Sequence, residues 1–184
     1  MQWLLESASH EVITFPSAQA FLDNFNGEIG CMLLDVRMPE INGLALQQIM
    51  QDRDIQMPII VLSGHGDIPM AVSAMKHGAL DFLEKPFDDE VLLRLVDKAL
   101  KRADEMRHEQ GELNEIQICH ESLSRREKEV MNLVVTGKAN REIAEELGIS
   151  PKTVEVHRAR VMSKMRASSL PVLVQQAARL TETA

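Results

Sequence analysis

Apolar runs alternate with helix-type patterns along residues 1–103. The runs are short and almost wholly apolar, whereas the segments between them carry apolar residues three and four positions apart. Strands of this kind are buried on both faces, so the alternation predicts an α/β domain with a parallel sheet and helices on both sides. The expected strands are 11–15, 31–35, 57–63 and 79–83, and the expected helices are 17–25, 43–51, 67–78 and one that begins near residue 88.

The last of these helices carries an apolar seam. From about Asp88 to Gln110, apolar residues follow a spacing of four and three, a pattern that packs on the helix's own sheet and in addition suits a second chain. Gly111 and the polar residues after it predict a linker. The seam consists of Leu92, Val96, Ala99, Ala103 and Met106.

Residues 124–180 read as helical throughout. Ser124 and Glu127 have the spacing of a capping box, and Ser150 followed by Pro151 is a typical helix start. Between these signals lies a short helix that ends at Gly148. A short helix, a tight glycine turn and a second helix, here about 151–165, form a helix-turn-helix pattern.

Charge divides the chain in the same way. Of the net charge of −8, residues 1–103 contribute −7, residues 104–123 contribute −5 and residues 124–184 contribute +4. An acidic front and a basic back predict two domains with different partners. The chain has two cysteines, no basic and apolar leader, and no apolar run of roughly 18 residues. We therefore expect a soluble, cytoplasmic protein without disulfides or a membrane segment.

Three of the expected strands end in polar side chains, Asp35, Ser63 and Lys85. Functional groups of an open parallel sheet gather outside the carboxyl ends of its strands. A carboxylate nucleophile, a hydroxyl and a cation suit phosphoryl transfer to Asp35, with Mg²⁺ to neutralise charge. The plainer alternative is that Asp35 caps the next helix, Ser63 is a turn residue and Lys85 is solvated.

Four stretches carry a family resemblance: LLDVRMPEINGL, PIIVLSGHGD, MKHGALDFLEKPF and LSRREKEVMNLVVTGKANREIAEELGISPKTVEVHRARVMSKM. They resemble bacterial two-component response regulators of the FixJ-like subfamily, over nearly the whole chain. The resemblance implies a flavodoxin-like receiver domain (1–103), a linker that extends its last helix (104–121) and a LuxR-type helix-turn-helix domain (122–184). It also implies a DNA-binding transcription regulator rather than an enzyme, controlled by a sensor histidine kinase.

The resemblance also assigns roles in the receiver domain. Asp35 is implied to be the phosphorylation site, Ser63 the switch hydroxyl, Phe82 the switch aromatic residue and Lys85 the cation. Asp35 and the backbone carbonyl of Arg37 are implied to bind Mg²⁺, and the Lys85–Pro86 bond is often cis in the family. Phe82 suits a plain core role equally well.

The chain departs from the family at its start. MQWLLESASH looks like the last turns of the receiver's first helix, so one strand and most of that helix, roughly twenty residues, do not precede it. The acid pair of that strand helps to hold Mg²⁺ in the family. We therefore expect weak Mg²⁺ binding and slow or absent phosphorylation, whether the short start is natural, a redesign or an artefact. Strand 11–15 must then pair with 31–35, borrow a strand from another chain, or hang loose.

The second helix of a helix-turn-helix enters the major groove of double-stranded DNA. By resemblance, Glu155, Val156 and Ala159 are expected at base-reading positions, and Arg158 contacts guanine or phosphate. A solvated helix face is the alternative, and for His157 a place at the core edge. The remaining expected DNA contacts, mostly near phosphates, are Lys152, Thr153, His157, Arg160 and Lys164.

The resemblance implies that phosphorylation shifts the receiver toward a state that dimerises through about residues 67–83, which raises DNA affinity. A homodimer is therefore expected. A rival interpretation is a truncated receiver that acts as a dimerisation module on full-length partners. A phosphatase is disfavoured because Arg37 stands two residues after Asp35, where a second acid would be needed.

Overall fold

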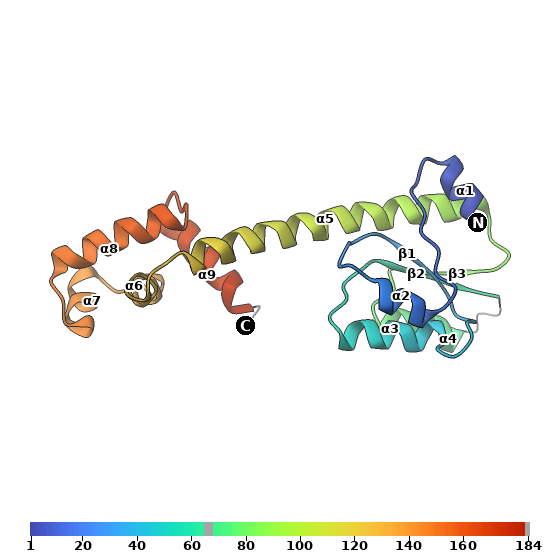
Figure 1. Cartoon of the computed structure of the whole chain (residues 1–184), viewed down its shortest axis with the longest axis horizontal. Coiled ribbons are helices and arrows are strands. Elements are labelled where there is room, and N and C mark those ends of the chain that lie inside the picture. Colours follow the sequence, from blue (N-terminus) through green and yellow to red (C-terminus); the bar gives the residue numbers. More distant parts are fainter. Residues whose placement is uncertain (65–67, 183–184) are drawn as a thin grey trace. The chain divides into compact units, whose positions relative to one another are not determined.

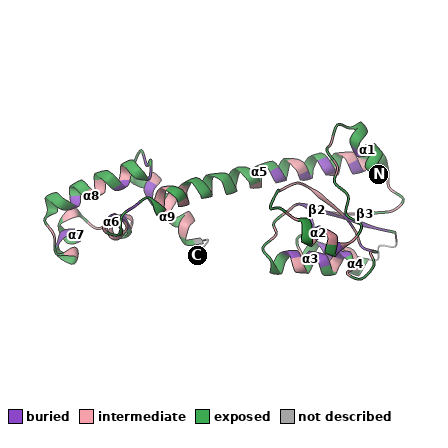
Figure 2. Ribbon diagram, in the orientation of Figure 1, coloured by how far each residue is buried: buried purple, intermediate pink, exposed green. Residues whose placement is uncertain are grey.

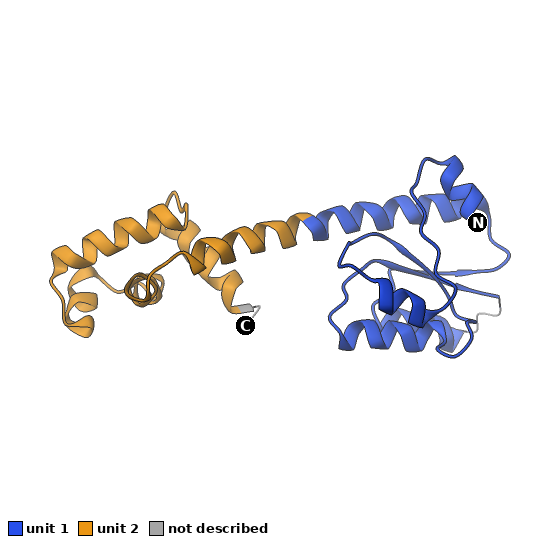
Figure 3. Cartoon of the chain, viewed as in Figure 1, with its two compact units in different colours: residues 1–107 blue, residues 108–184 orange. Residues whose placement is uncertain are grey.

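The computed structural model describes residues 1–64 and 68–182. The chain forms two compact units, Met1–Arg107 and His108–Ala184, each with its own core (Figures 1 and 3). Within the described residues, none of the helices combines the length and apolar character that crossing a bilayer requires.

The first unit is built on a parallel sheet of three strands, β1 (Met32–Asp35), β2 (Ile59–Ser63) and β3 (Asp81–Glu84), in that order. The central strand β2 is buried at every position because both of its faces are covered. Its side chains alternate: Ile59 and Val61 join one apolar cluster, and Ile60 and Leu62 join another. The predicted parallel sheet with two covered faces is confirmed.

Helices α2 (Ala18–Asn24), α3 (Gly43–Asp52) and α4 (Ile68–Lys76) contribute to the first cluster. Helix α1 (Gln2–Ser7) and the first part of α5 (Asp89–Glu121) contribute to the second. The predicted cap of α2 is confirmed, because the side chain of Ser17 accepts a hydrogen bond from the Ala20 N–H in the first turn.

The predicted strand 11–15 is wrong. These residues form no strand, and β1 is an outer strand of the described sheet. Ile13 is 69% exposed and Phe15 is 38% exposed, although the Phe15 ring contacts Phe21 edge to face at 5.5 Å. A strand needs a neighbour for its backbone groups, and of the three alternatives, pairing with residues 31–35 does not form. Local β propensity was therefore insufficient.

Helix α5 runs past Gly111 to Glu121, so residues 104–121 are helical throughout, as a linker that extends the last receiver helix. Its seam packs first against its own sheet, since Leu92, Val96, Ala99 and Ala103 are all buried. The plainer interpretation of the seam is therefore confirmed for this part of α5.

The second unit surrounds a core from α6 (Arg125–Val135), α7 (Asn140–Leu147), α8 (Pro151–Lys164) and α9 (Leu170–Glu182). Figure 2 shows the buried positions of these helices in purple. The capping box of Ser124 and Glu127 forms as predicted, and the Ser150 side chain caps α8 ahead of Pro151. Gly148 ends α7 in the left-handed conformation, φ 64°, which a residue without Cβ adopts readily. The predicted helix-turn-helix is formed by α7 and α8.

Candidate functional site

The carboxyl ends of β1, β2 and β3 bring Asp35 and Lys85 together. Lys85 Nζ donates to Asp35 Oδ2 at 2.5 Å, and the Arg37 backbone N–H donates to Asp35 Oδ1 at 2.9 Å. The Lys85 backbone N–H also donates to the Ser63 carbonyl at 2.7 Å, which places Lys85 beside the end of β2. The Lys85–Pro86 bond is cis, as it often is in the family that the sequence resembles. The Asp35 side chain is 39% exposed, so a reactant can reach it from solvent.

The opposing effects on the Asp35 carboxyl have a net direction. Partial burial raises its pKa, but the hydrogen bonds from Lys85 and the Arg37 N–H lower it, and the positive charges of both side chains lower it further. The net pKa lies below the usual value for aspartate. Asp35 is therefore a carboxylate at neutral pH, the form that a nucleophile requires.

Gly43 fixes the backbone next to Asp35. A Cβ at Gly43 would lie 2.5 Å from the Asp35 carbonyl oxygen, a distance that van der Waals radii do not permit. The Gly43 N–H also donates to the Val36 carbonyl at 3.1 Å. The start of α3 can thus approach the end of β1 only because position 43 has no side chain.

Ser63 is buried, whereas Phe82 is half-buried like Asp35. Ser63 is 1% exposed, and one contact of its Oγ is the Met70 sulfur in α4, at 3.6 Å. Phe82 is half-buried and packs against the cluster that contains Leu34 and Val61. Ser63 thus ends β2, the strand next to Asp35, and contacts α4, whereas Phe82 lies within β3 on the far side of β2.

The described residues do not complete a metal site. No group of three or more His, Cys, Asp or Glu side chains suited to a metal occurs in residues 1–64 and 68–182. Asp35 supplies one carboxylate, and both of its oxygens already accept hydrogen bonds. Mg²⁺ takes about six oxygen ligands, so these residues with the Arg37 carbonyl fit it poorly.

Helix α8 presents a continuous polar face in the second unit. Val154 and Val161 are fully buried and hold the helix against α6 and α7. Val156 is 44% exposed although it is apolar, and His157 and Arg158 are half-buried. The other predicted DNA contacts are exposed, namely Lys152, Thr153, Glu155, Ala159, Arg160 and Lys164.

Several of these side chains have partners inside the unit. Lys152 Nζ donates to Glu155 Oε2 at 2.7 Å, and Arg158 Nη1 donates to Asn140 Oδ1 at 3.0 Å. The first pair is exposed and exchanges readily with other ions, whereas the second orients Arg158 from α7. His157 Nδ1 is buried without a hydrogen-bond partner among the described residues. This location agrees with the alternative that places the ring at the core edge.

Lys164 is bound within the domain. Its Nζ donates to Glu127 Oε2 at 2.7 Å and to the Ser122 carbonyl at 3.0 Å. The Glu127 side chain is only 4% exposed, and its other bond comes from the Ser124 N–H at 2.8 Å. The predicted phosphate contact of Lys164 stays a prediction, and these two bonds compete with it.

Comparisons with known proteins assign both units. The receiver domain of response regulators ("Response regulator receiver domain") matches residues 1–97, and the family described as "Bacterial regulatory proteins, luxR family" matches residues 121–177. The chain belongs to the two-component response regulators with a LuxR-type DNA-binding domain.

Named relatives support this assignment along nearly the whole response regulator. It is 48% identical over 178 residues to the transcriptional regulatory protein FixJ of Azorhizobium caulinodans, which covers 96% of this chain and 84% of the relative. It is 45% identical over 181 residues to the response regulator TodT of Pseudomonas putida F1, covering 98% and 80%. The solved structure of the response regulator StyR has a TM-score of 0.81 at 40% identity, covering 97% and 90%.

The relatives are transcriptional regulators, and the matched LuxR-type domain does not favour the rival interpretation of a dimerisation module alone. The sequence analysis did not predict the contacts of two residues of this response regulator. Glu127 was found only as a helix cap, because its partner Lys164 lies 37 residues away. Gly43 gave no signal beyond a helix start, although it determines how closely α3 approaches Asp35.

Proposed function

We propose that Asp35 of this response regulator accepts a phosphoryl group from a sensor histidine kinase and that this controls DNA binding by α8. The observation that carries the proposal is the Asp35 carboxylate itself. It is solvent-accessible, its pKa is lowered, and Lys85 Nζ lies 2.5 Å away at the open edge of the sheet. Such a cation suits the new phosphoryl oxygens once they replace the carboxylate as its partner.

The transfer is a displacement at phosphorus. A carboxylate oxygen of Asp35 forms the new P–O bond while the P–N bond of the kinase's phosphohistidine breaks, and the departing imidazole takes a proton from solvent. Lys85 then holds the phosphoryl oxygens, and Ser63 donates a hydrogen bond after a change at its contact with Met70. Phe82 turns inward in the same change.

Receiver domains generally use Mg²⁺ for this reaction. Asp35 and the Arg37 carbonyl are the ligands that we assign, and this donor set is incomplete. We expect the chain of 184 residues to bind Mg²⁺ weakly and to be phosphorylated slowly or not at all.

The outward face of α8 is proposed to read the major groove. Val156 and Ala159 suit the methyl groups of thymine, Glu155 can accept from cytosine, and Arg158 suits guanine or phosphate. Exposure of the apolar Val156 at 44% supports this use of the face. The phosphate contacts are assigned to Lys152, Thr153, His157, Arg160 and, in competition with its internal bonds, Lys164.

A homodimer is proposed to form through α4 and β3. Helix α4 exposes Ile68, Val72 and Met75 at helical spacing, with exposed fractions of 80%, 47% and 48%. Two copies joined by this apolar stripe would hold two α8 helices for two half-sites, which raises the affinity for DNA.

We place this regulator in the cytoplasm.

The phosphoacceptor is tested with acetyl phosphate and Mg²⁺, followed by the mass of the intact protein. We expect at most a small fraction of chains to gain one phosphoryl group, and Asp35→Asn to gain none. Stoichiometric phosphorylation of the unchanged protein would refute the incomplete Mg²⁺ site. Label on Asp35→Asn would refute Asp35 as the acceptor.

DNA binding is tested separately by footprinting across many genomic fragments at low ionic strength. We expect defined protected tracts, because sequence-dependent contacts add to the general attraction of phosphates. Absence of any protected tract would refute the regulatory function of α8.

A further inference from the structure

A buried glutamine connects α3 to the end of α4. Gln47 is 1% exposed, and its Nε2 donates to the backbone carbonyls of Ala74 at 3.0 Å and His77 at 3.1 Å. Gln51, one turn further along α3, donates its Nε2 to the same His77 carbonyl at 2.9 Å. Two amides of α3 therefore bind the last turn of α4.

The carbonyls in question belong to a helix end. The last carbonyls of an α-helix lack partners within the helix, and other groups must satisfy them. Helix α4 ends at Lys76, and the chain turns at Gly78 with φ 84° before it enters β3. The Ala79 N–H also donates to the Ala74 carbonyl at 3.0 Å. The His77 carbonyl accepts from both glutamines, so they act as a side-chain cap supplied by α3.

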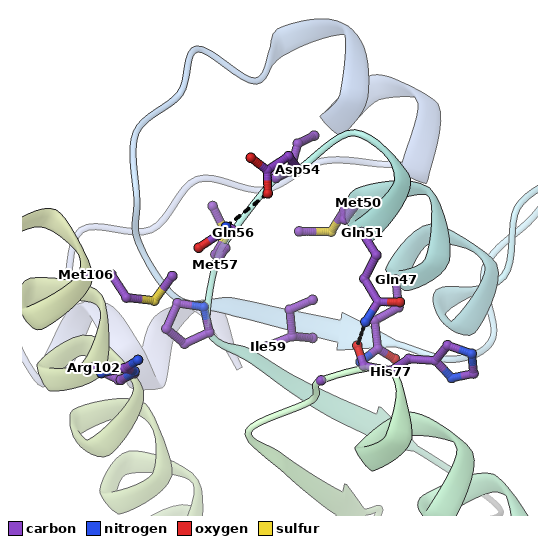
Figure 4. A pocket seen from close by; sticks show the side chains of 13 residues that line it. Gln47, Met50, Gln51, Asp54, Gln56, Met57, Ile59, His77, Arg102 and Met106 are labelled. Carbon is purple, nitrogen blue, oxygen red and sulfur yellow. Dashed lines mark hydrogen bonds between the residues drawn. The ribbon is translucent and has the colours of Figure 1, made fainter. Parts of the chain in front are cut away.

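The hydrogen bonds lie beside an open cavity. An open cavity of about 490 Å³ lies beside this turn and is lined by Gln47, Gln51, His77 and Gly78 together with apolar residues such as Met50 and Ile59 (Figure 4). Figure 4 shows the hydrogen bond to His77 at the wall of this cavity. The cavity lies next to the His77 carbonyl, whereas Ala74, in the last turn of α4, is itself fully buried.

Gln47 accepts an unfavourable contact to make these bonds. Its Oε1 is buried and has no hydrogen-bond partner among the described residues. Leaving such an acceptor unpaired is destabilising, and an apolar residue of similar size would avoid it. The Gln47 amide therefore provides two hydrogen bonds to the end of α4 and leaves one of its own acceptors unpaired.

We infer that Gln47 sets the orientation of α4 and thereby of its exposed stripe, Ile68, Val72 and Met75. Helix α3 begins at Gly43, next to the Asp35 carbonyl. Near its other end, Gln51 donates a hydrogen bond to the His77 carbonyl, just after α4. Helix α3 thus connects the phosphoacceptor end of β1 to the fixed end of α4, while Met70 near the start of α4 contacts Ser63. Because these hydrogen bonds hold the end of α4, the helix pivots about that end when the contact between Ser63 and Met70 changes.

The claim that a second copy binds the stripe rests on the proposed function. The claim that Gln47 restrains the end of α4 does not depend on it. The test therefore has two readouts. The first is amide hydrogen exchange in the full chain at His77, Gly78 and Ala79, measured for Gln47→Met. The matched control is Gln48→Met, the same change at the neighbouring exposed residue, whose Nε2 bonds only to Asp52 of its own helix.

Gln47→Met should speed exchange at these three amides roughly tenfold or more, since two hydrogen bonds are lost, while β2 stays protected. Gln48→Met should leave exchange unchanged. Gln51→Met changes an exposed residue and removes a single hydrogen bond, so it should increase the exchange rate less. This variant replaces Gln47→Met in the test if Gln47→Met unfolds the domain. Unchanged exchange in both Gln47→Met and Gln51→Met would overturn the inference.

The second readout is self-association by sedimentation, with Val72→Asp as the variant that attacks the stripe directly. We expect Val72→Asp to abolish self-association and Gln47→Met to weaken it severalfold. Loss in Val72→Asp with unchanged association in Gln47→Met would overturn the orienting role of Gln47. Unchanged association in Val72→Asp would instead refute the proposed dimer face, and faster exchange in Gln47→Met would still support the restraint on α4.

Discussion

Replacing Glu127 with glutamine tests the ion pair that ties α8 to the start of α6. Glutamine keeps the size of the side chain and an oxygen for the Ser124 N–H, but it removes the charge that Lys164 binds. The hydrogen bond from Lys164 and the bond from the Ser124 N–H lower the pKa of Glu127 from 4.5 to about 2. The perturbation therefore isolates the charge of a side chain that is 4% exposed.

The magnitude follows from linkage between ionisation and folding. A lowering from 4.5 to about 2 corresponds to at most about 3 kcal/mol of folding free energy. We expect a loss of roughly 2 kcal/mol at neutral pH, because Lys164 is partly solvated. The folded pKa is depressed, so this stability is fully present above the unfolded pKa of 4.5 and disappears as the pH falls through about 2. At about pH 3.5 the difference between the two proteins should already be smaller by about 1 kcal/mol.

Urea unfolding is followed through the methyl NMR signals of Met131 and Met165. Both methionines are buried in the core of the second unit, at 2% and 1% exposure, so they report on that unit alone. The matched control is Glu142→Gln, because Glu142 caps α7 through the Ala139 N–H at 2.7 Å and pairs with no lysine in the described part of the chain. It should cost within about 0.5 kcal/mol. An equal loss in both variants, or a loss from Glu127→Gln that does not shrink in acid, would refute the reasoning.

Three further predictions concern DNA reading and the Asp35 edge. Lys152→Ala should weaken binding to all duplexes and reduce the salt dependence by about one ion, measured by fluorescence titration; an unchanged slope would exclude a phosphate contact. Val156→Ala should change which sequence is preferred by about 1 kcal/mol, with little effect on the salt slope; unchanged preference in a binding selection would exclude it from base reading. Gly43→Ala should destabilise the first unit by about 1–3 kcal/mol, because the new Cβ would lie 2.5 Å from the Asp35 carbonyl oxygen. Unfolding is followed at the Met50 methyl signal, and wild-type stability would show that the backbone shifts without cost.

Local signals in the sequence predicted most of the helices and strands and part of the phosphoacceptor site. Caps such as Ser124 with Glu127 depend on residues three apart, and buried strands such as 57–63 are read from their own composition. The strand ends also predicted that Asp35 and Lys85 meet, because the carboxyl ends of parallel strands share one edge.

Tertiary structure alone decided what depends on partners far along the chain. Residues 11–15 have a strand-like composition but no adjacent strand to receive their backbone hydrogen bonds, so they form none. The helical position of Lys164 predicted an outward contact, yet its long side chain reaches Glu127 on α6. Gln47 carries no local signal at all, since its partners are backbone carbonyls 27 and 30 residues later. A sequence pattern specifies which face a residue occupies, whereas the packed chain determines which group meets it there.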